Sequence, residues 1–288
     1  MIFSHQESDS LNCPPISQTN IEMERKRIKS FFTTMIALVM LLFYSISCAG
    51  SVVNEEIDIN PSDEKSFAVL GNSISTYFGT MPPGYPFYYS SKRLSKQEMW
   101  WSLLAQKTNT SMIANSSWSG ATVAYVQSLD SLSFFYSDFR ITSLARNGVP
   151  DAIFVLGGTN DWARSIPLGN SEETNKDQVT TFYGSYSLMV RKLKNHYPNS
   201  MIFLCGILPR KEGGNARNRS GWTIKQGNNA IREIAERYKV VYIDMDDCGM
   251  AHDIQNCTFD GLHPNQWGMA MVADKIIEMA QNSKPFIF

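Results

Sequence analysis

Two hydrophobic patterns alternate along the chain from position 67 onward. Five short stretches are almost continuously apolar, which is typical of strands buried on both faces of a parallel sheet; they are 67–71, 111–115, 152–156, 201–205 and 240–244. Longer stretches between and after them carry apolar residues three and four positions apart, as an amphipathic helix does; they are 96–108, 137–147, 176–196, 220–238 and 265–282. This alternation predicts an α/β domain with a parallel sheet covered by helices on both faces.

The first 48 residues follow neither pattern. A basic stretch at 23–29 precedes an apolar run at 31–46, and this order is typical of a signal peptide. The run is 16 residues long, whereas a helix needs roughly 20 to span a bilayer. It ends at small residues around Cys48, which resemble the lipidation site of bacterial lipoproteins, with Ser45 where those sites usually have Leu. We therefore expect export, either to the periplasm or to the membrane of a bacterial envelope through a lipid on Cys48. An uncleaved anchor helix and an ordinary signal peptide remain alternatives.

These patterns predict three parts. Residues 1–48 form an N-terminal extension with the signal segment, for which Met1 and Met23 are alternative starts. Residues 49–66 form an acidic, Pro-containing linker, and residues 67–288 form one globular domain without internal repeats.

Composition and charge exclude several classes of protein. The 288 residues are 43% hydrophobic and 18% charged, which is ordinary for a globular protein and excludes a disordered, collagen-like or coiled-coil chain. The 26 basic side chains balance 27 acidic ones, so no overall positive field attracts nucleic acid, and we expect no such partner. Five cysteines are too few for a disulfide scaffold. Because export would oxidise a suitable pair, we predict one disulfide between Cys248 and Cys257, nine positions apart.

Candidate chemistry follows the first three predicted strands, because ligands of such sheets bind at the carboxyl ends of the strands. Ser73 stands just beyond the first strand, where its hydroxyl serves either as a nucleophile or as a helix cap. Gly120, after the second strand, offers a backbone N–H, and Asn160, after the third, offers a side-chain amide. Both groups are of the kind that stabilises an oxyanion, although each residue type is also common in turns.

A serine nucleophile needs a neighbouring base, and the chain has four histidines. His5 precedes the signal segment, His196 ends a predicted helix where it caps the dipole, and His252 reads as a surface residue. His263 stands three residues after Asp260, just before the last helix. This spacing lets the carboxylate reach Nδ1–H of the imidazole, as in a hydrolytic triad.

The four blocks, Gly-x-Ser, Gly, Gly-x-Asn-Asp and Asp-x-x-His, occur here in the order found in the SGNH hydrolase, or GDSL esterase/lipase, superfamily. The chain resembles a bacterial acyl-hydrolase subgroup of that superfamily over about residues 67–281. The resemblance implies a three-layer α/β/α sandwich with a five-stranded parallel sheet of flavodoxin-like type, which agrees with the hydrophobic pattern.

The resemblance also implies roles for five residues. Ser73 is the nucleophile and contributes its own N–H to the oxyanion hole, which Gly120 and Asn160 complete, while His263 is the general base and Asp260 orients it. The chemistry needs no metal and no organic cofactor. The acidic stretch at 244–247 lacks the spacing of a calcium loop, and we interpret it as a solvated strand end. In this sequence Asn72 takes the place of the family's usual Asp before the serine.

The expected function is that of an exported serine esterase acting through an acyl-enzyme on short-chain, above all acetyl, esters of carbohydrates or small molecules. Tyr77 and Tyr85, in an aromatic loop after Ser73, and Trp162, after Asn160, are candidates for stacking on a sugar, with packing of the loop as the alternative. The polar stretches 165–174 and 209–220 offer no apolar acyl groove. The alternatives are a lysophospholipase or thioesterase of the same superfamily and a non-catalytic glycan-binding relative.

Overall fold

The computed structural model describes residues 64–173, 177 and 179–282. The predicted signal segment, the lipidation site at Cys48 and most of the predicted linker lie outside these residues. Within the described ranges, no helix combines the length and the apolar character needed to cross a bilayer.

Five parallel strands form the central sheet, in the order β2-β1-β3-β4-β5. They are β1 (Ser66–Gly71), β2 (Ser111–Asn115), β3 (Ala152–Leu156), β4 (Met201–Cys205) and β5 (Val241–Ile243). All five strands expected from the sequence are present, and the predicted α/β fold with a five-stranded parallel sheet is confirmed.

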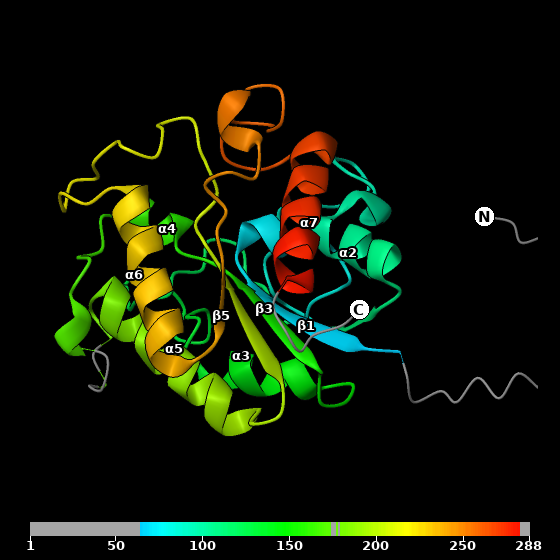
Figure 1. The fold of residues 1–288 in the computed structure, drawn as a ribbon, viewed down its shortest axis with the longest axis horizontal. Coiled ribbons are helices and arrows are strands. Elements are labelled where there is room, and N and C mark those ends of the chain that lie inside the picture. Colours follow the sequence, from blue (N-terminus) through cyan, green and yellow to red (C-terminus); the bar gives the residue numbers. More distant parts are fainter. Residues whose placement is uncertain (1–63, 174–176, 178, 283–288) are drawn as a thin grey trace, which may run out of the picture. The chain divides into compact units, whose positions relative to one another are not determined.

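Helices cover both faces of the sheet (Figure 1). Helices α2 (Trp100–Thr108) and α7 (Gln266–Gln281) lie on one face, and α5 (Phe182–His196) and α6 (Ile224–Tyr238) lie on the other. Alternate strand residues face the two layers: Phe67 and Val69 belong to the cluster under α2 and α7, whereas Ala68 and Leu70 belong to the cluster under α5 and α6. Both clusters are fully buried, which explains the unbroken apolar runs of the strands.

Several helices begin later or end sooner than the hydrophobic period predicts. The side chain of Thr181 caps α5 by accepting a hydrogen bond from Gly184 N, and Thr223 caps α6 in the same way from Gln226 N. Extended backbone at Met99 separates the 3-10 turn η2 (Lys96–Glu98) from α2. The stretch expected as a helix at 137–147 consists of α3 (Asp138–Thr142) and the 3-10 turn η3 (Ser143–Ala145).

Several short elements were not expected from the sequence. The single helical turn α4 (Thr159–Ala163) follows β3, and the 3-10 turns η4 (Ser171–Glu173) and η5 (Met250–His252) lie in loops. They are too short to produce a recognisable hydrophobic period.

The predicted disulfide is wrong for this structure. Cys248 and Cys257 are both free and buried, and both belong to the apolar cluster on the side of α2 and α7. The Cys257 thiol points to the carbonyl of Met250 at 3.6 Å instead of to a second sulfur. Burial raises the pKa of the Cys248 thiol to about 11, so it stays protonated.

The strand order creates a crevice at the carboxyl ends of β1 and β3. From β1 the chain moves outward to β2 and then returns to β3 on the other side of β1. The loops after β1 and β3 therefore diverge, and open α/β sheets bind ligands at such a switch point.

Candidate active site

The turn after β1 fixes the position of Ser73. Asn72 caps the 3-10 turn η1 (Ser73–Ser75), because its Oδ1 accepts a hydrogen bond from Ile74 N at 3.0 Å. A Cβ atom at Gly71 would lie only 2.6 Å from the side chain of Ser75, so glycine is needed there. Asn72 thus supplies an acceptor oxygen to the turn, as the family's Asp would, and its replacement of Asp leaves the cap intact.

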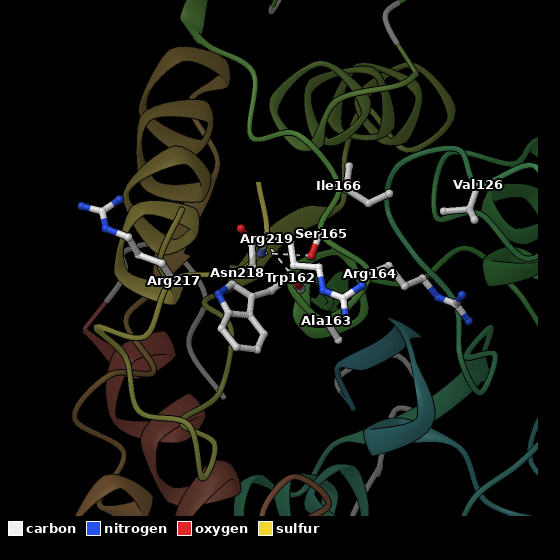
Figure 2. A pocket seen from close by; sticks show the side chains of 9 residues that line it. All are labelled: Val126, Trp162, Ala163, Arg164, Ser165, Ile166, Arg217, Asn218 and Arg219. Atoms are coloured by element: carbon white, nitrogen blue, oxygen red, sulfur yellow. Dashed lines mark hydrogen bonds between the residues drawn. The ribbon is translucent and has the colours of Figure 1, made fainter. Parts of the chain in front are cut away.

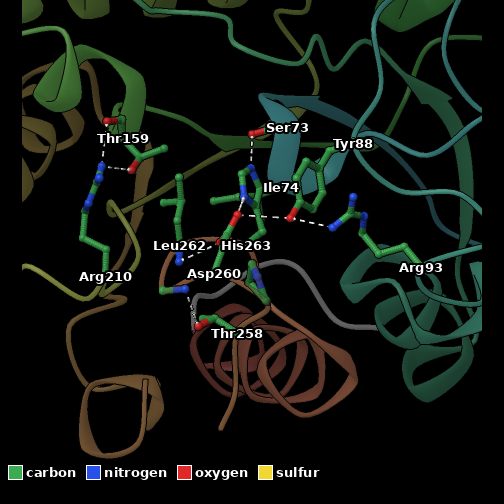
Figure 3. Close-up of polar contacts among 12 residues, drawn as sticks. Ser73, Ile74, Tyr88, Arg93, Thr159, Arg210, Thr258, Asp260, Leu262 and His263 are labelled. Carbon is green, nitrogen blue, oxygen red and sulfur yellow. Dashed lines mark hydrogen bonds and ion pairs between the residues drawn. The ribbon is translucent and has the colours of Figure 1, made fainter. Parts of the chain in front are cut away.

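Ser73, His263 and Asp260 form a continuous chain of hydrogen bonds (Figure 3). Nε2 of His263 lies 2.9 Å from Oγ of Ser73, and Nδ1 lies 2.7 Å from Oδ2 of Asp260. The other carboxylate oxygen of Asp260 accepts the backbone N–H groups of Leu262 and His263, at 3.1 and 2.8 Å. The three-residue spacing therefore makes a tight turn that aims the carboxylate at its own histidine.

The electrostatics of this pair suit a base. Partial burial disfavours the Asp260 carboxylate, but hydrogen bonds from His263 and Leu262 outweigh it and bring the pKa of Asp260 to about 2. Burial lowers the pKa of His263, the hydrogen bond and charge of Asp260 oppose this, and Arg93 and Arg210 lower it further. At neutral pH we therefore assign an ionised Asp260 and a neutral His263 with Nδ1–H directed to the carboxylate, which leaves Nε2 free to accept a proton.

The backbone N–H groups of Ser73 and Gly120, which the resemblance assigns to an oxyanion hole, are available to a ligand. Gly120 lies in the loop after β2 with φ of +80°, a left-handed conformation that favours glycine. Within the described chain, the N–H groups of Ser73 and Gly120 donate to no protein acceptor. Asn160, on α4, donates one amide hydrogen to the carbonyl of Ala121 at 2.8 Å and keeps its second amide hydrogen. The Asn160 amide thus lies against the loop that carries Gly120.

Asp161, the last residue of the Gly-x-Asn-Asp block, is a site residue that sequence reasoning missed. Its two carboxyl oxygens accept the N–H groups of Val123 and Ala124, at 3.0 and 2.9 Å. Its side chain is fully buried, and this burial raises its pKa to about 7 against the effect of the two hydrogen bonds. Asp161 therefore binds the loop of Gly120 to α4. Its place directly after Asn160 was the available signal.

Arg140 is a second buried charge that the sequence did not reveal. Its guanidinium donates to the carbonyls of Gly71, Ser116 and Ser133, at distances between 2.5 and 3.0 Å. Complete burial lowers its pKa to about 9. This side chain links the end of β1 to the start of the loop after β2, and no local sequence pattern indicates such a role.

The aromatic loop does not present the tyrosines proposed to contact a sugar. Tyr77 is only 7% exposed and packs edge-on against Trp101, and Tyr85, also 7% exposed, packs against Trp118 with ring centroids 4.4 Å apart. The burial of these two rings, and of Trp162 at the same 7%, favours the packing alternative over stacking on a sugar. The exposed rings are those of Phe78 and Phe87.

Trp162 lies on α4 and lines a hollow of about 700 Å³ (Figure 2). The guanidinium carbon of Arg210 lies over this ring, 4.6 Å from the ring centroid. Its Nε1 is buried without a hydrogen-bond partner among the described residues. The hollow is bordered by Val126, Trp162, Ala163, Arg164, Ser165, Ile166, Arg217, Asn218 and Arg219.

Tyr88 and Arg93 were also missed, although Tyr88 contacts both His263 and Asp260 and Arg93 contacts Tyr88. The Tyr88 ring stacks on the His263 ring with centroids 3.6 Å apart, and Arg93 hydrogen-bonds the Tyr88 hydroxyl (Figure 3). Tyr88 was visible in the sequence only as one of several aromatics in the loop.

The acidic stretch at 244–247 is engaged with protein partners. Asp244 pairs with Arg232 at 2.8 Å, Asp247 pairs with Lys275 at 2.9 Å, and Asp246 accepts a hydrogen bond from an asparagine of α6. Among the residues that the structure describes, no group of three or more His, Cys, Asp or Glu side chains could hold a metal ion.

The family profile described as GDSL-like Lipase/Acylhydrolase matches residues 65–280. The chain belongs to this family. The resemblance drawn from the four sequence blocks is therefore confirmed, and this GDSL-like protein is a hydrolase of that superfamily, whose members act as ester hydrolases. A comparison with curated protein sequences found no match.

Solved structures share the fold of this GDSL-like protein. A protein described as a GDSL-like lipase from Bacteroides ovatus is 24% identical, with a TM-score of 0.58 over 76% of this chain and 99% of its own. One from Bacteroides uniformis is 22% identical, with a TM-score of 0.57 over 76% and 97%. The salicylyl-acyltransferase SsfX3 of a tetracycline biosynthetic pathway is 14% identical, with a TM-score of 0.54 over 78% and 56%. At these identities the likeness shows the architecture alone.

Proposed function

We propose that the protein is a serine esterase that cleaves short-chain esters through an acyl-enzyme. The observation that carries this proposal is the hydrogen-bond chain from Ser73 Oγ through His263 to Asp260, at 2.9 and 2.7 Å. Ser73 begins the 3-10 turn just after the carboxyl end of β1, and within the described ranges its own backbone N–H donates to no protein acceptor. A glycan-binding relative without catalysis would not need a base aligned on a serine.

In the first step Ser73 Oγ attacks the ester carbonyl while its proton passes to Nε2 of His263. The negative charge that develops on the carbonyl oxygen meets the N–H groups of Ser73 and Gly120 and the free amide hydrogen of Asn160. His263 then gives its proton to the leaving alcohol, and the acyl group stays on Ser73.

In the second step water attacks the acyl-enzyme with His263 again as the base. The proton taken from water returns to Ser73 Oγ as the carboxylic acid departs, so the enzyme is restored. Asp260 keeps the imidazole in its tautomer throughout and stabilises the imidazolium that forms.

We further propose a short acyl group, above all acetyl, on a carbohydrate or another polar alcohol. The hollow beside α4 supports this choice, because the polar side chains of Arg164, Arg219 and Asn218 border it. The loop over this hollow is polar, and Asn218 ties it to α4 through the carbonyl of Trp162 at 3.1 Å. Such walls suit sugar hydroxyls better than a fatty acyl chain.

A lipase or thioesterase activity is the second candidate, and one observation favours it. The exposed Phe78 and Phe87 rings, 5.1 Å apart, border a second hollow of about 690 Å³ that also contacts Met81 and Pro82. An acyl chain bound there would gain about 0.8 kcal/mol for each buried CH₂ group.

Export, and a lipid on Cys48, remain proposals that rest on the sequence of the first 48 residues. Palmitate labelling of cells that produce the wild-type chain or its Cys48→Ala variant tests the lipid. Equal labelling of both would overturn it.

The decisive test of the catalytic proposal is labelling with a fluorophosphonate, followed by mapping of the modified peptide. We expect one label, on Ser73, and none on the Ser73→Ala variant, which should also lose turnover of p-nitrophenyl acetate. The matched control is Ser128→Ala, at an exposed serine, and it should label and turn over like wild type. Turnover by Ser73→Ala at the wild-type rate would rule out the proposed mechanism.

A further inference from the structure

We propose that Tyr88 and Arg93 are positioning residues that hold the His263–Asp260 pair in its productive arrangement and favour the uncharged imidazole. The inference rests on the proposed esterase function and concerns two residues outside the family's four blocks.

The Tyr88 ring is a platform for the catalytic imidazole. The two rings are 3.6 Å apart and only 11° from parallel. Arg93 covers the opposite face of Tyr88, with its guanidinium carbon 4.3 Å from the ring centroid (Figure 3). The imidazole therefore cannot tilt toward Tyr88, and Tyr88 cannot retreat without displacing Arg93.

The polar contacts have a fixed direction. Arg93 Nη1 lies 3.0 Å from the Tyr88 hydroxyl, and that hydroxyl lies 3.1 Å from Asp260 Oδ2. Arginine can only donate, so the Tyr88 oxygen accepts from Arg93 and directs its own proton to Asp260. The oxygen that receives this proton is the one that also receives Nδ1–H of His263. Burial, followed by the charge of Asp260, raises the pKa of Tyr88, so the phenol keeps its proton.

Tyr88 is tied to the turn of the nucleophile as well. Its backbone N–H donates to the hydroxyl of Thr76 at 2.9 Å, and this hydroxyl donates to the carbonyl of Ser73 at 2.9 Å. One residue thus contacts the imidazole, the carboxylate and, through Thr76, the serine turn. This arrangement fixes the distance between Ser73 Oγ and His263 Nε2 from both ends.

Several charged groups around His263 influence its pKa, and Arg93 is one of them. Asp260 on its own loop favours the imidazolium, and Arg210 and Arg93 disfavour it. Near them, Glu212 pairs with Arg210, the stem of Lys211 packs against Gly261, Tyr89 donates to the Pro264 carbonyl, and Ser73 faces Nε2. Arg93 has no ion pair within the described ranges, so its charge acts on the pair without a neutralising carboxylate. Loss of Arg93 should therefore raise the pKa of His263.

The first test measures the titration of His263 directly, by NMR in the Ser73→Ala background, and needs no turnover. We expect Arg93→Gln to move the midpoint upward by about 0.5 pH unit, as one charge at this range does in a medium between water and protein. The shift should shrink in 1 M salt because exposed charges are screened. The control Lys92→Gln removes an equal charge from the neighbouring exposed side chain and should leave the midpoint in place.

The second test separates positioning from general support of the fold. Tyr88→Phe keeps the ring and loses the hydroxyl, so we expect kcat to fall about tenfold with little change in KM. Only the neutral imidazole accepts the proton from Ser73. A rise in the pKa of His263 in this variant should therefore move the acid limb of the kcat/KM profile to higher pH. Tyr88→Leu also loses the stacked ring and should lower kcat further.

The possible results distinguish the two proposals. An active Ser73→Ala variant would overturn the esterase mechanism, whereas the titration of His263 would still report on Arg93. If Ser73→Ala is inactive while Arg93→Gln and Tyr88→Phe keep the wild-type midpoint, acid limb and kcat, the positioning role is wrong.

Discussion

The Ser73 hydroxyl is a weak nucleophile, and its reactivity depends on three neighbouring groups. His263 can take its proton because Asp260 fixes the tautomer and because burial lowers the pKa of the imidazole. Asn160 differs from these residues, because its amide is neutral at all relevant pH values. Its effect depends only on where the amide hydrogen lies. In the proposed mechanism it stabilises the carbonyl oxygen of the ester only as that oxygen becomes negative.

Asn160→Ala should therefore affect the chemical step more than binding. We expect kcat to fall about a hundred- to a thousand-fold with KM nearly unchanged, which is the usual cost of one lost oxyanion donor. Steady-state kinetics with p-nitrophenyl acetate measure this, and Asn199→Ala, at an exposed position after α5, is the control. A change in KM alone would mean that Asn160 binds substrate without stabilising the oxyanion.

The elements contribute loops, and two buried charges hold these loops together. Arg140 binds carbonyls at the ends of β1 and β2, and Asp161 joins α4 to the loop after β2. Neither side chain faces the ester in the proposed mechanism. Asp161 and Asn160 both bond the stretch that follows Gly120, so the proposed oxyanion hole would depend on contacts between elements.

Asp161→Asn tests this dependence. An asparagine has one acceptor oxygen, so the N–H of either Val123 or Ala124 would face an NH₂ group. We expect a loss of about 1–3 kcal/mol in the free energy of unfolding, the cost of one unsatisfied buried donor, together with a lower kcat. Urea unfolding and acetate ester kinetics measure the two effects.

The control for this variant is Asp138→Asn, which removes an exposed ion pair with Lys192. It should cost less than about 1 kcal/mol. If Asp161→Asn unfolds and turns over like this control, the loop after β2 is held by other contacts.

At the scale of the whole molecule, the sheet sets where the site lies, and the loops around the site determine which ester substrates can bind. The hollow beside α4 has arginines and an asparagine on its walls, and the aromatic loop borders a second, more apolar hollow around Phe78 and Phe87. In the proposed function the polar hollow suits a short acyl group on a polar alcohol, and the apolar hollow suits a longer acyl chain. Which of the two hollows receives the acyl group depends on how the loops of the folded domain pack.

We predict that kcat/KM falls from acetyl to octanoyl esters of p-nitrophenol and that acetylated sugars are better substrates than lysophospholipids. The reason is that burial of each CH₂ stabilises a bound acyl chain only where an apolar groove receives it. A rising profile that Phe87→Ser reverses would assign the acyl chain to the aromatic loop and favour the lipase alternative.

Much of this arrangement was readable from the sequence alone. The strands were predictable because burial on both faces leaves a continuous apolar run, and the approach of Asp260 to His263 was predictable because three residues span one turn. Ser73, Gly120 and Asn160 could be assigned to one edge because parallel strands end together there. In each case the signal is local or follows from strand direction.

Tertiary structure decided what depends on contacts between distant residues. Tyr88 and Asp260 are 172 positions apart, and nothing near Tyr88 in the sequence distinguishes it from Tyr77 or Tyr85. Which aromatic rings are buried, which one stacks on the imidazole and whether two cysteines meet depend on how the loops pack. The hydrophobic pattern shows only that these side chains are more stable when buried than in water. Which side chains they pack against depends on the conformation of the loops.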